Sequence, residues 1–175
     1  EAANAGVLNL LDMHGMETFQ PNLRQLGDST QFANYYFAGY AATVLDGHGT
    51  QYGFPIPTLE KPEDAKQWVQ NRVDAGVDYI KIIVEPWKAT LDSVTVAAII
   101  AEAHAHNKKA VVHISKKKDA LMAIDSGADG LVHIWKDGPM TKEEFARLNR
   151  NEDFFVIPTI LVNYAVQEAY LNKTT

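Results

Sequence analysis

The sequence predicts an α/β fold with parallel strands, arranged either as an open doubly wound sheet or as an incomplete (β/α)8 barrel of the TIM type. Six candidate strands alternate with helical segments, and no pair of strands is spaced as an antiparallel hairpin. This alternation indicates a parallel sheet. A complete barrel typically needs about 250 residues, whereas this chain has 175. No linker divides the chain, so we expect a single domain over residues 1–175.

The candidate strands are short apolar runs bounded by polar or turn-forming residues. They cover Val7–Asp12, Tyr36–Thr43, Tyr79–Val84, Ala110–Ile114, Leu131–Trp135 and Phe154–Ile157. The run Tyr79–Val84 is continuously apolar apart from one lysine and rich in β-branched residues, which is typical of a strand buried on both faces of a parallel sheet. Gly39 weakens the second candidate, because a glycine inside a strand packs no side chain.

The helices are predicted from apolar periodicity and from their end signals. They run from Pro62 to about Ala75, over Ser93–His106, over Lys117–Ser126, from Thr141 onward, and over Ile160–Asn172. Pro62 suits the first position of a helix, and Gly76 lies just beyond its end. Thr141 forms a capping box with Glu144, three residues further on. A long loop, Leu45–Lys61, separates the second strand from the first of these helices.

The composition fits a soluble globular protein and excludes certain partners. The chain has 16 Lys and Arg against 22 Asp and Glu, a net charge of −6. Such a surface does not attract nucleic acid or an anionic membrane. No apolar run approaches the roughly 18 residues of a membrane-spanning helix. The absence of cysteine excludes disulfides and thiolate metal sites. The compartment, cytoplasmic or periplasmic, is not assigned by the sequence.

Two near-identical motifs place a histidine at the ends of consecutive strands. They read Val-Val-His-Ile and Leu-Val-His-Ile, with His113 and His133 in the third position. Sites in parallel α/β folds are built at the carboxyl ends of the strands. Two imidazoles presented there by neighbouring strands could approach one metal ion, and nitrogen ligands suit zinc. The alternative is that both are hydrogen-bonded structural residues.

Lys81 lies inside the apolar run Tyr79–Val84, where an ammonium group is costly to bury. Three interpretations remain. The side chain reaches the end of the sheet and pairs with a carboxylate. Alternatively, its amine has a depressed pKa and acts as a Schiff-base nucleophile, as in aldolases. In the third interpretation, carbon dioxide converts the amine to a carbamate that two metal ions share, which would account for both histidines as well.

The order of these motifs along the chain resembles the amidohydrolase superfamily. The likeness is strongest to its imidazolonepropionase-like branch, which includes the Xaa-Pro dipeptidases (prolidases). It runs from about the second barrel strand to the seventh. The motifs that carry it are Gly6-Val7 leading to Asp12-Met13, Gly47-His48-Gly49, Asp78-Tyr79-Ile80-Lys81-Ile82, Glu102-Ala103-His104 leading to His113, and Gly127-Ala128-Asp129-Gly130 leading to His133.

The resemblance implies a deformed (β/α)8 barrel that binds one or two divalent metal ions, with zinc as the first expectation. Lys81 would be the carboxylated bridging lysine on the fourth strand. His113 and His133 would be metal ligands on the fifth and sixth strands. His48 would lie near the substrate and steady its carbonyl or oxyanion, and the alternative for it is an exposed loop histidine. For His14 we favour a structural role.

The implied activity is hydrolysis of a C–N bond in a small substrate, such as a dipeptide or an N-acyl amino acid. Two features of the family should lie beyond this chain: the His-x-His of the first strand and the Asp of the eighth. We therefore expect a fragment that is inactive alone and holds at most one weak metal site. Its open edges favour association with itself or with the rest of the barrel. A Schiff-base lyase that uses Lys81 and a non-catalytic α/β module are the alternatives.

Overall fold

The computed structural model describes residues 2–27, 29 and 31–161, and every strand pairing within them is parallel. The elements follow in this order: η1 (Ala3–Ala5), β1 (Asn9–Asp12), α1 (Gln20–Leu26), β2 (Asn34–Phe37), η2 (Thr50–Tyr52), η3 (Pro62–Asp64), α2 (Ala65–Asp74), β3 (Tyr79–Ile83), α3 (Ser93–Ala105), β4 (Lys109–His113), α4 (Lys117–Asp125), β5 (Gly130–Val132), α5 (Lys142–Ala146), η4 (Leu148–Arg150) and β6 (Phe155–Ile157).

The strands neighbour one another in the order of the chain. β1 pairs with β2, and β3 to β6 form a four-stranded sheet in sequence order. A bridge between Ala42 and Ile82 joins the two sheets. There the Ala42 N–H donates to the Lys81 carbonyl at 2.8 Å, and the Ile83 N–H donates to the Ala42 carbonyl at 2.9 Å. A doubly wound sheet would reverse its strand order. The described strands therefore form an incomplete (β/α)8 barrel, and the doubly wound alternative is wrong.

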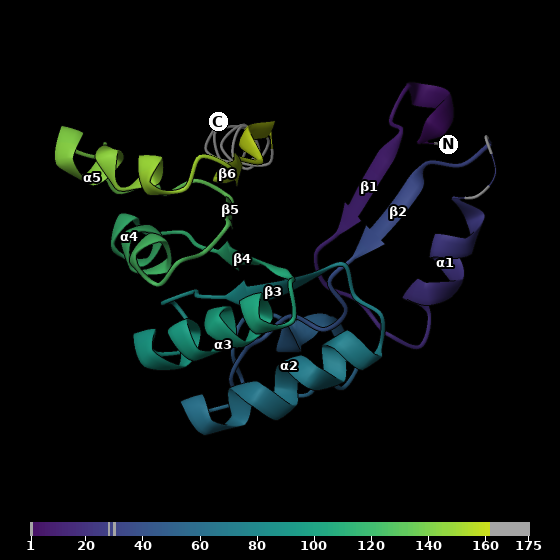
Figure 1. Ribbon diagram of the computed structural model, residues 1–175, viewed down its shortest axis with the longest axis horizontal. Coiled ribbons are helices and arrows are strands. Elements are labelled where there is room, and N and C mark those ends of the chain that lie inside the picture. The colour runs from purple at the N-terminus through teal and green to yellow at the C-terminus, as the bar shows by residue number, and fades with distance from the viewer. Residues whose placement is uncertain (1, 28, 30, 162–175) are drawn as a thin grey trace, which may run out of the picture.

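The helices follow the outside of this curved row of strands (Figure 1). α2 packs on α3, α3 contacts β3 and β4, and α1 contacts β2. The main core lies between helices and strands and contains Ile80 and Ile82 of β3 with Val112 of β4. Because side chains alternate along a strand, Lys81 faces the opposite side, which we call the inner face. None of the described helices is long and apolar enough to cross a membrane.

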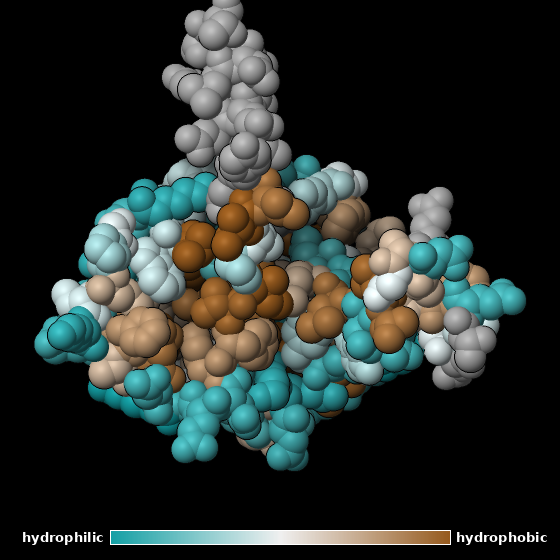
Figure 2. Space-filling view, turned by 90° about the horizontal axis from the view of Figure 1, so that it is seen from above, coloured by the Kyte–Doolittle hydropathy of each residue, from teal (hydrophilic) through white to brown (hydrophobic). Residues whose placement is uncertain are grey.

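The inner face is hollowed, and apolar side chains gather near its centre (Figure 2). A second, smaller apolar cluster lies on this face and includes Tyr79, Val111 and Val132. The first three residues of β1 are exposed, and its two leucines, Leu10 and Leu11, together with the preceding Leu8, leave much of their surface uncovered. The inner face thus combines an apolar lining with the one lysine of β3.

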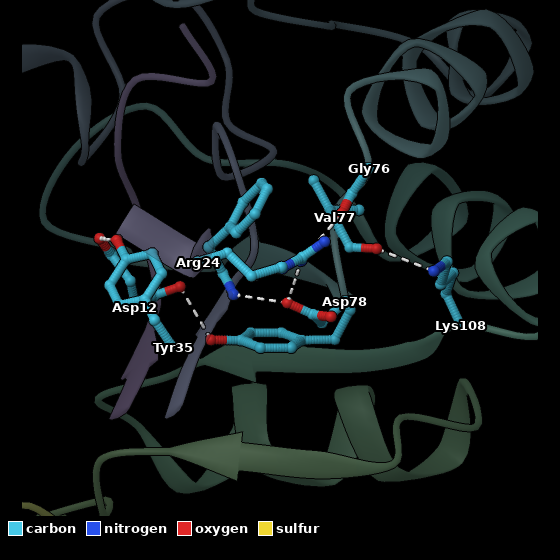
Figure 3. A network of polar contacts seen from close by, with 9 residues as sticks. Asp12, Arg24, Tyr35, Gly76, Val77, Asp78 and Lys108 are labelled. Carbon is cyan, nitrogen blue, oxygen red and sulfur yellow. Dashed lines mark hydrogen bonds and ion pairs between the residues drawn. The ribbon is translucent and has the colours of Figure 1, made fainter. Parts of the chain in front are cut away.

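Polar contacts tie β1, α1 and β2 to the start of β3 (Figure 3). The Asp78 carboxylate accepts hydrogen bonds from Arg24 Nη2 at 2.5 Å and from the Phe37 N–H at 2.8 Å. The Tyr79 hydroxyl donates to the Asp12 carbonyl at 2.8 Å. Asp78 and Tyr79 are consecutive, so two neighbouring residues at the start of β3 contact all three N-terminal elements.

Three sequence expectations need correction. The second strand covers Asn34–Phe37 instead of Tyr36–Thr43, because Gly39 takes φ +69° and leaves the extended conformation. The helix α1 was not expected. The strand predicted over Leu131–Trp135 ends at Val132, since the next residue has φ +73°. Most of the predicted helix Ile160–Asn172 lies outside the described residues. The remaining strands and helices agree with expectation to within a few residues.

Candidate active site

The carboxyl ends of the strands surround a pocket of about 480 Å³ on the inner face. The pocket brings together the four residues proposed from the sequence, Lys81, His48, His113 and His133. The ring centroids of His113 and His133 are 4.5 Å apart, and those of His48 and His113 are 4.9 Å apart. The other lining residues are Leu11, Met13, His14, Tyr52, Ile83, Val132, Ile157 and Thr159.

Lys81 is only 3% exposed, and its Nζ has no hydrogen-bond partner among the described residues. Alternation along β3 aims it into the pocket. Burial lowers the pKa of Lys81 to about 7. No ion pair joins Lys81 to a carboxylate in the part of the chain that the structure describes. The amine is therefore buried at considerable cost unless a further group compensates it.

His113, the last residue of β4, is neutral and has one occupied ring nitrogen. Its Nε2 lies 3.0 Å from Glu85 Oε2. Burial, with the positive charge of Lys81 and the neighbouring His133, lowers the pKa of His113 to about 2. Because an ionised carboxylate only accepts hydrogen bonds, Nε2 carries the proton and Nδ1 keeps a lone pair. Nδ1 makes no hydrogen bond to a described residue.

His133 stands just after β5 in a conformation uncommon for a residue with a side chain. Its φ is +73°, and that of Thr159 after β6 is +46°. Such left-handed residues cluster at functional sites. The Thr159 hydroxyl and His133 Nδ1 are 2.5 Å apart, so the two residues hold each other. Burial and Lys81 lower the pKa of His133. Nε2 of His133 is the nitrogen left available within the described residues.

His48 is held by a hydrogen-bonded loop. The Gly49 N–H donates to Gln51 Oε1 at 2.8 Å, which fixes the amide so that Gln51 Nε2 donates to His48 Nδ1 at 3.1 Å. Burial lowers the pKa of His48, so the ring is neutral and its proton lies on Nε2. In this tautomer His48 is a hydrogen-bond donor toward the pocket, which suits a carbonyl or oxyanion rather than a metal ion.

His14 has both ring nitrogens occupied by backbone groups. Nδ1 accepts from the Ala41 N–H at 2.9 Å, and Nε2 lies 3.3 Å from the Gly49 carbonyl. With Nδ1 an acceptor, Nε2 is the donor in the neutral ring. His14 joins the loop after β1 to the loop that carries His48, which agrees with the structural role favoured from the sequence.

The residues present fit a divalent metal through an unusual donor set. No three His, Asp or Glu side chains in the described ranges are arranged to hold a metal ion. However, His113 and His133 each have one ring nitrogen available, and the unpartnered amine of Lys81 lines the same pocket. Carbon dioxide would convert that amine to an anionic carbamate. Nitrogen and oxygen ligands of this kind suit zinc.

Three polar residues of this region were not singled out from the sequence. Glu85, Gln51 and Thr159 contact His113, His48 and His133 respectively. Glu85 carried a usable signal, because it is an acid placed directly after the buried run of β3, at the same sheet edge as His113. Gln51 lies in η2 and Thr159 follows β6, and nothing in the sequence pattern indicates which side chain either residue contacts.

The fold is similar to that of several solved structures, among them a Xaa-Pro dipeptidase, an amidohydrolase and an ochratoxinase. A Xaa-Pro dipeptidase with bound methionine in the active site is 20% identical with a TM-score of 0.71, over 87% of this chain and 42% of the other. The ochratoxinase of A. niger is 16% identical with a TM-score of 0.76, over 95% of this chain and 45% of the other. Phenylurea hydrolase B is 18% identical with a TM-score of 0.65, over 89% of this chain and 43% of the other. This chain thus spans less than half the length of these structures. No family model and no curated protein matches the sequence.

Proposed function

We propose that the protein containing this chain is a metal-dependent hydrolase that cleaves a C–N bond in a small substrate, such as a dipeptide or an N-acyl amino acid. The observation that carries the proposal is the buried amine of Lys81, unpartnered among the described residues, in one pocket with His113 and His133. The similar folds of a dipeptidase, an ochratoxinase and a phenylurea hydrolase support it.

In this proposal, Nδ1 of His113, Nε2 of His133 and the carbamate of Lys81 would hold one or two divalent ions, with zinc as the first candidate. When bound, such an ion supplies Lewis acidity toward the scissile carbonyl and lowers the pKa of a water molecule. The carbamate would also remove the burial problem of Lys81, because an anion between cations replaces an unpaired ammonium group.

His48 contributes to the reaction through its Nε2–H. Aimed into the pocket, this group donates a hydrogen bond to the substrate carbonyl, and the bond strengthens as negative charge develops on the oxygen. Gln51 keeps the proton on Nε2 by donating to Nδ1. The apolar walls, with Leu11, Ile83 and Ile157 among them, exclude water and accept an apolar part of the substrate.

Metal titration of the purified chain tests the proposal. We expect Zn²⁺ and Co²⁺ to bind weakly at one site, and bicarbonate to strengthen binding by promoting the carbamate. Lys81→Met should abolish the bicarbonate effect, and His113→Ala or His133→Ala should abolish binding. His104→Ala is the matched control, because this histidine pairs with Asp129 outside the pocket. Binding that survives loss of both pocket histidines would contradict the proposal.

A second candidate is Schiff-base chemistry at Lys81, which its pKa of about 7 favours because the neutral amine is the nucleophile. Borohydride reduction in the presence of a small aldehyde or ketone, followed by mass spectrometry, tests it. A reduced adduct on Lys81, together with no effect of bicarbonate on metal binding, would replace the hydrolase by the lyase. The hydrolase predicts the opposite pair of results.

A further inference from the structure

A buried carboxylate that the proposed reaction does not use lies behind His113. Glu85 follows β3 by two residues and is 5% exposed. Its Oε1 accepts a hydrogen bond from Ser115 Oγ at 2.6 Å, and its Oε2 lies 3.0 Å from His113 Nε2. Its backbone N–H donates to Thr90 Oγ1 at 3.0 Å. Both carboxylate oxygens and the backbone amide of Glu85 therefore have partners.

We propose that Glu85 is a positioning residue for the metal centre, which holds the proton of His113 on Nε2 and so presents the Nδ1 lone pair to the pocket. This inference rests on the proposed function. A neutral imidazole has a single N–H, and a carboxylate accepts only that N–H. Metal-binding histidines commonly donate their second nitrogen to a carboxylate, which fixes the ring and raises its basicity as a ligand.

The orientation of the two side chains is determined by the sheet. His113 pairs in register with Ile83 of β3 and with Val132 of β5. The Val84 N–H donates to the His113 carbonyl at 3.0 Å, which fixes the backbone just before Glu85. Ser115, two residues beyond His113, then occupies Oε1 and leaves Oε2 for the ring. The three side chains form one connected unit across two neighbouring strands.

Glu85 is placed to support a ligand and not to be one. Among the described residues, the side chains that line the pocket include no Asp or Glu. Glu85 lines a neighbouring hollow instead, with Trp87 and Asp137. Glu85 therefore acts on the pocket only through its hydrogen bond with His113 and does not itself occupy a ligand position at the metal. This separates Glu85 from Lys81, which lines the pocket itself.

The first test is the tautomer of His113 in the metal-free chain, read from nitrogen NMR of the imidazole rings. We expect Nε2–H in the wild-type protein, and in Glu85→Ala a ring that exchanges between both tautomers. A wild-type ring that carries its proton on Nδ1 would overturn the proposal. This measurement needs no metal, so it judges Glu85 even if the chain binds none and the proposed function fails.

The second test is Co²⁺ affinity, followed by the visible absorption of the ion. Removal of such a supporting partner typically weakens binding about 10- to 100-fold, and we expect this for Glu85→Ala. Glu85→Gln keeps the size of the side chain and part of its hydrogen bonding, so its Co²⁺ affinity should fall less. It also serves as the control for a folding defect in Glu85→Ala. Asp137→Asn removes a charge from the same hollow with no hydrogen bond to His113 and is the control. Equal effects of Glu85→Ala and Asp137→Asn would refute the positioning role.

Discussion

The four histidines around the pocket differ in which ring nitrogen their neighbours occupy. Both ring nitrogens of His14 contact backbone groups. His48 keeps an N–H available to donate, and His113 keeps a nitrogen lone pair available. Neutral rings follow from burial, which lowers the pKa of each of them. One residue type thus serves as structural link, hydrogen-bond donor and candidate metal ligand, and the neighbouring side chain decides which.

Lys81→Met is expected to stabilise the metal-free chain while it removes metal binding. The buried ammonium or amine has no described hydrogen-bond partner, and a buried polar group in that state costs about 1–3 kcal/mol. Methionine has a similar length and carries no such cost. Urea denaturation in metal-free, carbon dioxide-depleted buffer measures the change in the free energy of unfolding.

The control for this substitution is Ile83→Met on the same face of β3. It exchanges one apolar side chain for another and should cost less than about 1.5 kcal/mol. If Lys81→Met instead destabilises the chain more than Ile83→Met does, Lys81 has a stabilising partner in the folded protein. The site would then be structural rather than functional.

The helix α3 begins at a cap that depends on pH. Asp92 Oδ1 accepts a hydrogen bond from the Thr95 N–H at 2.7 Å, and this bond favours the ionised form, so the pKa of Asp92 is lowered from its usual 3.8. A carboxyl group whose pKa is lowered in the folded state stabilises the protein at pH values above its pKa in the unfolded state. This contribution is lost as the pH falls through its pKa in the folded state. We expect Asp92→Ala to be less stable than wild type at pH 7.

This difference should shrink progressively below about pH 4, where Asp92 takes up a proton in the unfolded chain before it does so in the folded protein. Asp92→Asn keeps an acceptor at the cap but not the charge, so its stability at pH 7 should lie between those of wild type and Asp92→Ala. Thermal denaturation of the three proteins between pH 7 and pH 3 measures the effect. A constant gap between wild type and Asp92→Ala across this range would show that the cap does not depend on ionisation.

Elements with strong local signals could be predicted from the sequence, and those set by tertiary contacts could not. The β-branched run of β3 and the capping box at Thr141 are local signals, and both appear as expected. α1 has little apolar periodicity, and it is held instead by Arg24, which binds Asp78 far along the chain. The same limit applies to the pocket. The strand pattern placed Lys81 and His113 on neighbouring strands, and both line one pocket, but the contact of Glu85 with His113 depends on the pairing of two strands.

At the scale of the whole molecule, the N-terminal elements are attached to the four-stranded sheet by polar contacts as well as by Phe37 of β2, which lies in the main core. The bridge at Ala42 and the Asp78 network account for one side of this junction. On the other side, Glu17 of the β1–α1 connection forms an ion pair with Arg72 of α2. β1 and β6 each lack a second neighbour within the described residues. Association through these edges, expected from the sequence, stays a prediction.

The Glu17–Arg72 pair provides a test of this junction. Arg72 is 5% exposed, and its guanidinium lies 4.7 Å from the ring centre of Trp68. Burial raises the pKa of Glu17, while the Tyr40 N–H and Arg72 act in the opposite direction. Removal of one partner of a buried pair leaves an uncompensated charge and typically costs about 3–5 kcal/mol. We therefore expect Arg72→Met to destabilise the chain by this amount, as measured by urea denaturation.

The double variant Glu17→Gln, Arg72→Met measures the interaction between the two side chains apart from their other contacts. Because neither charge is then left alone, the double variant should be more stable than the sum of the single effects predicts, with a coupling free energy above about 1 kcal/mol. Amide hydrogen exchange shows which strands lose protection when the ion pair is removed. If the pair holds the junction, Arg72→Met should speed exchange in β1 and β2 while the amides of β3 and β4 stay protected. Additive single effects, or faster exchange throughout the chain, would mean that the N-terminal elements and the sheet unfold as one unit and that this ion pair does not join them.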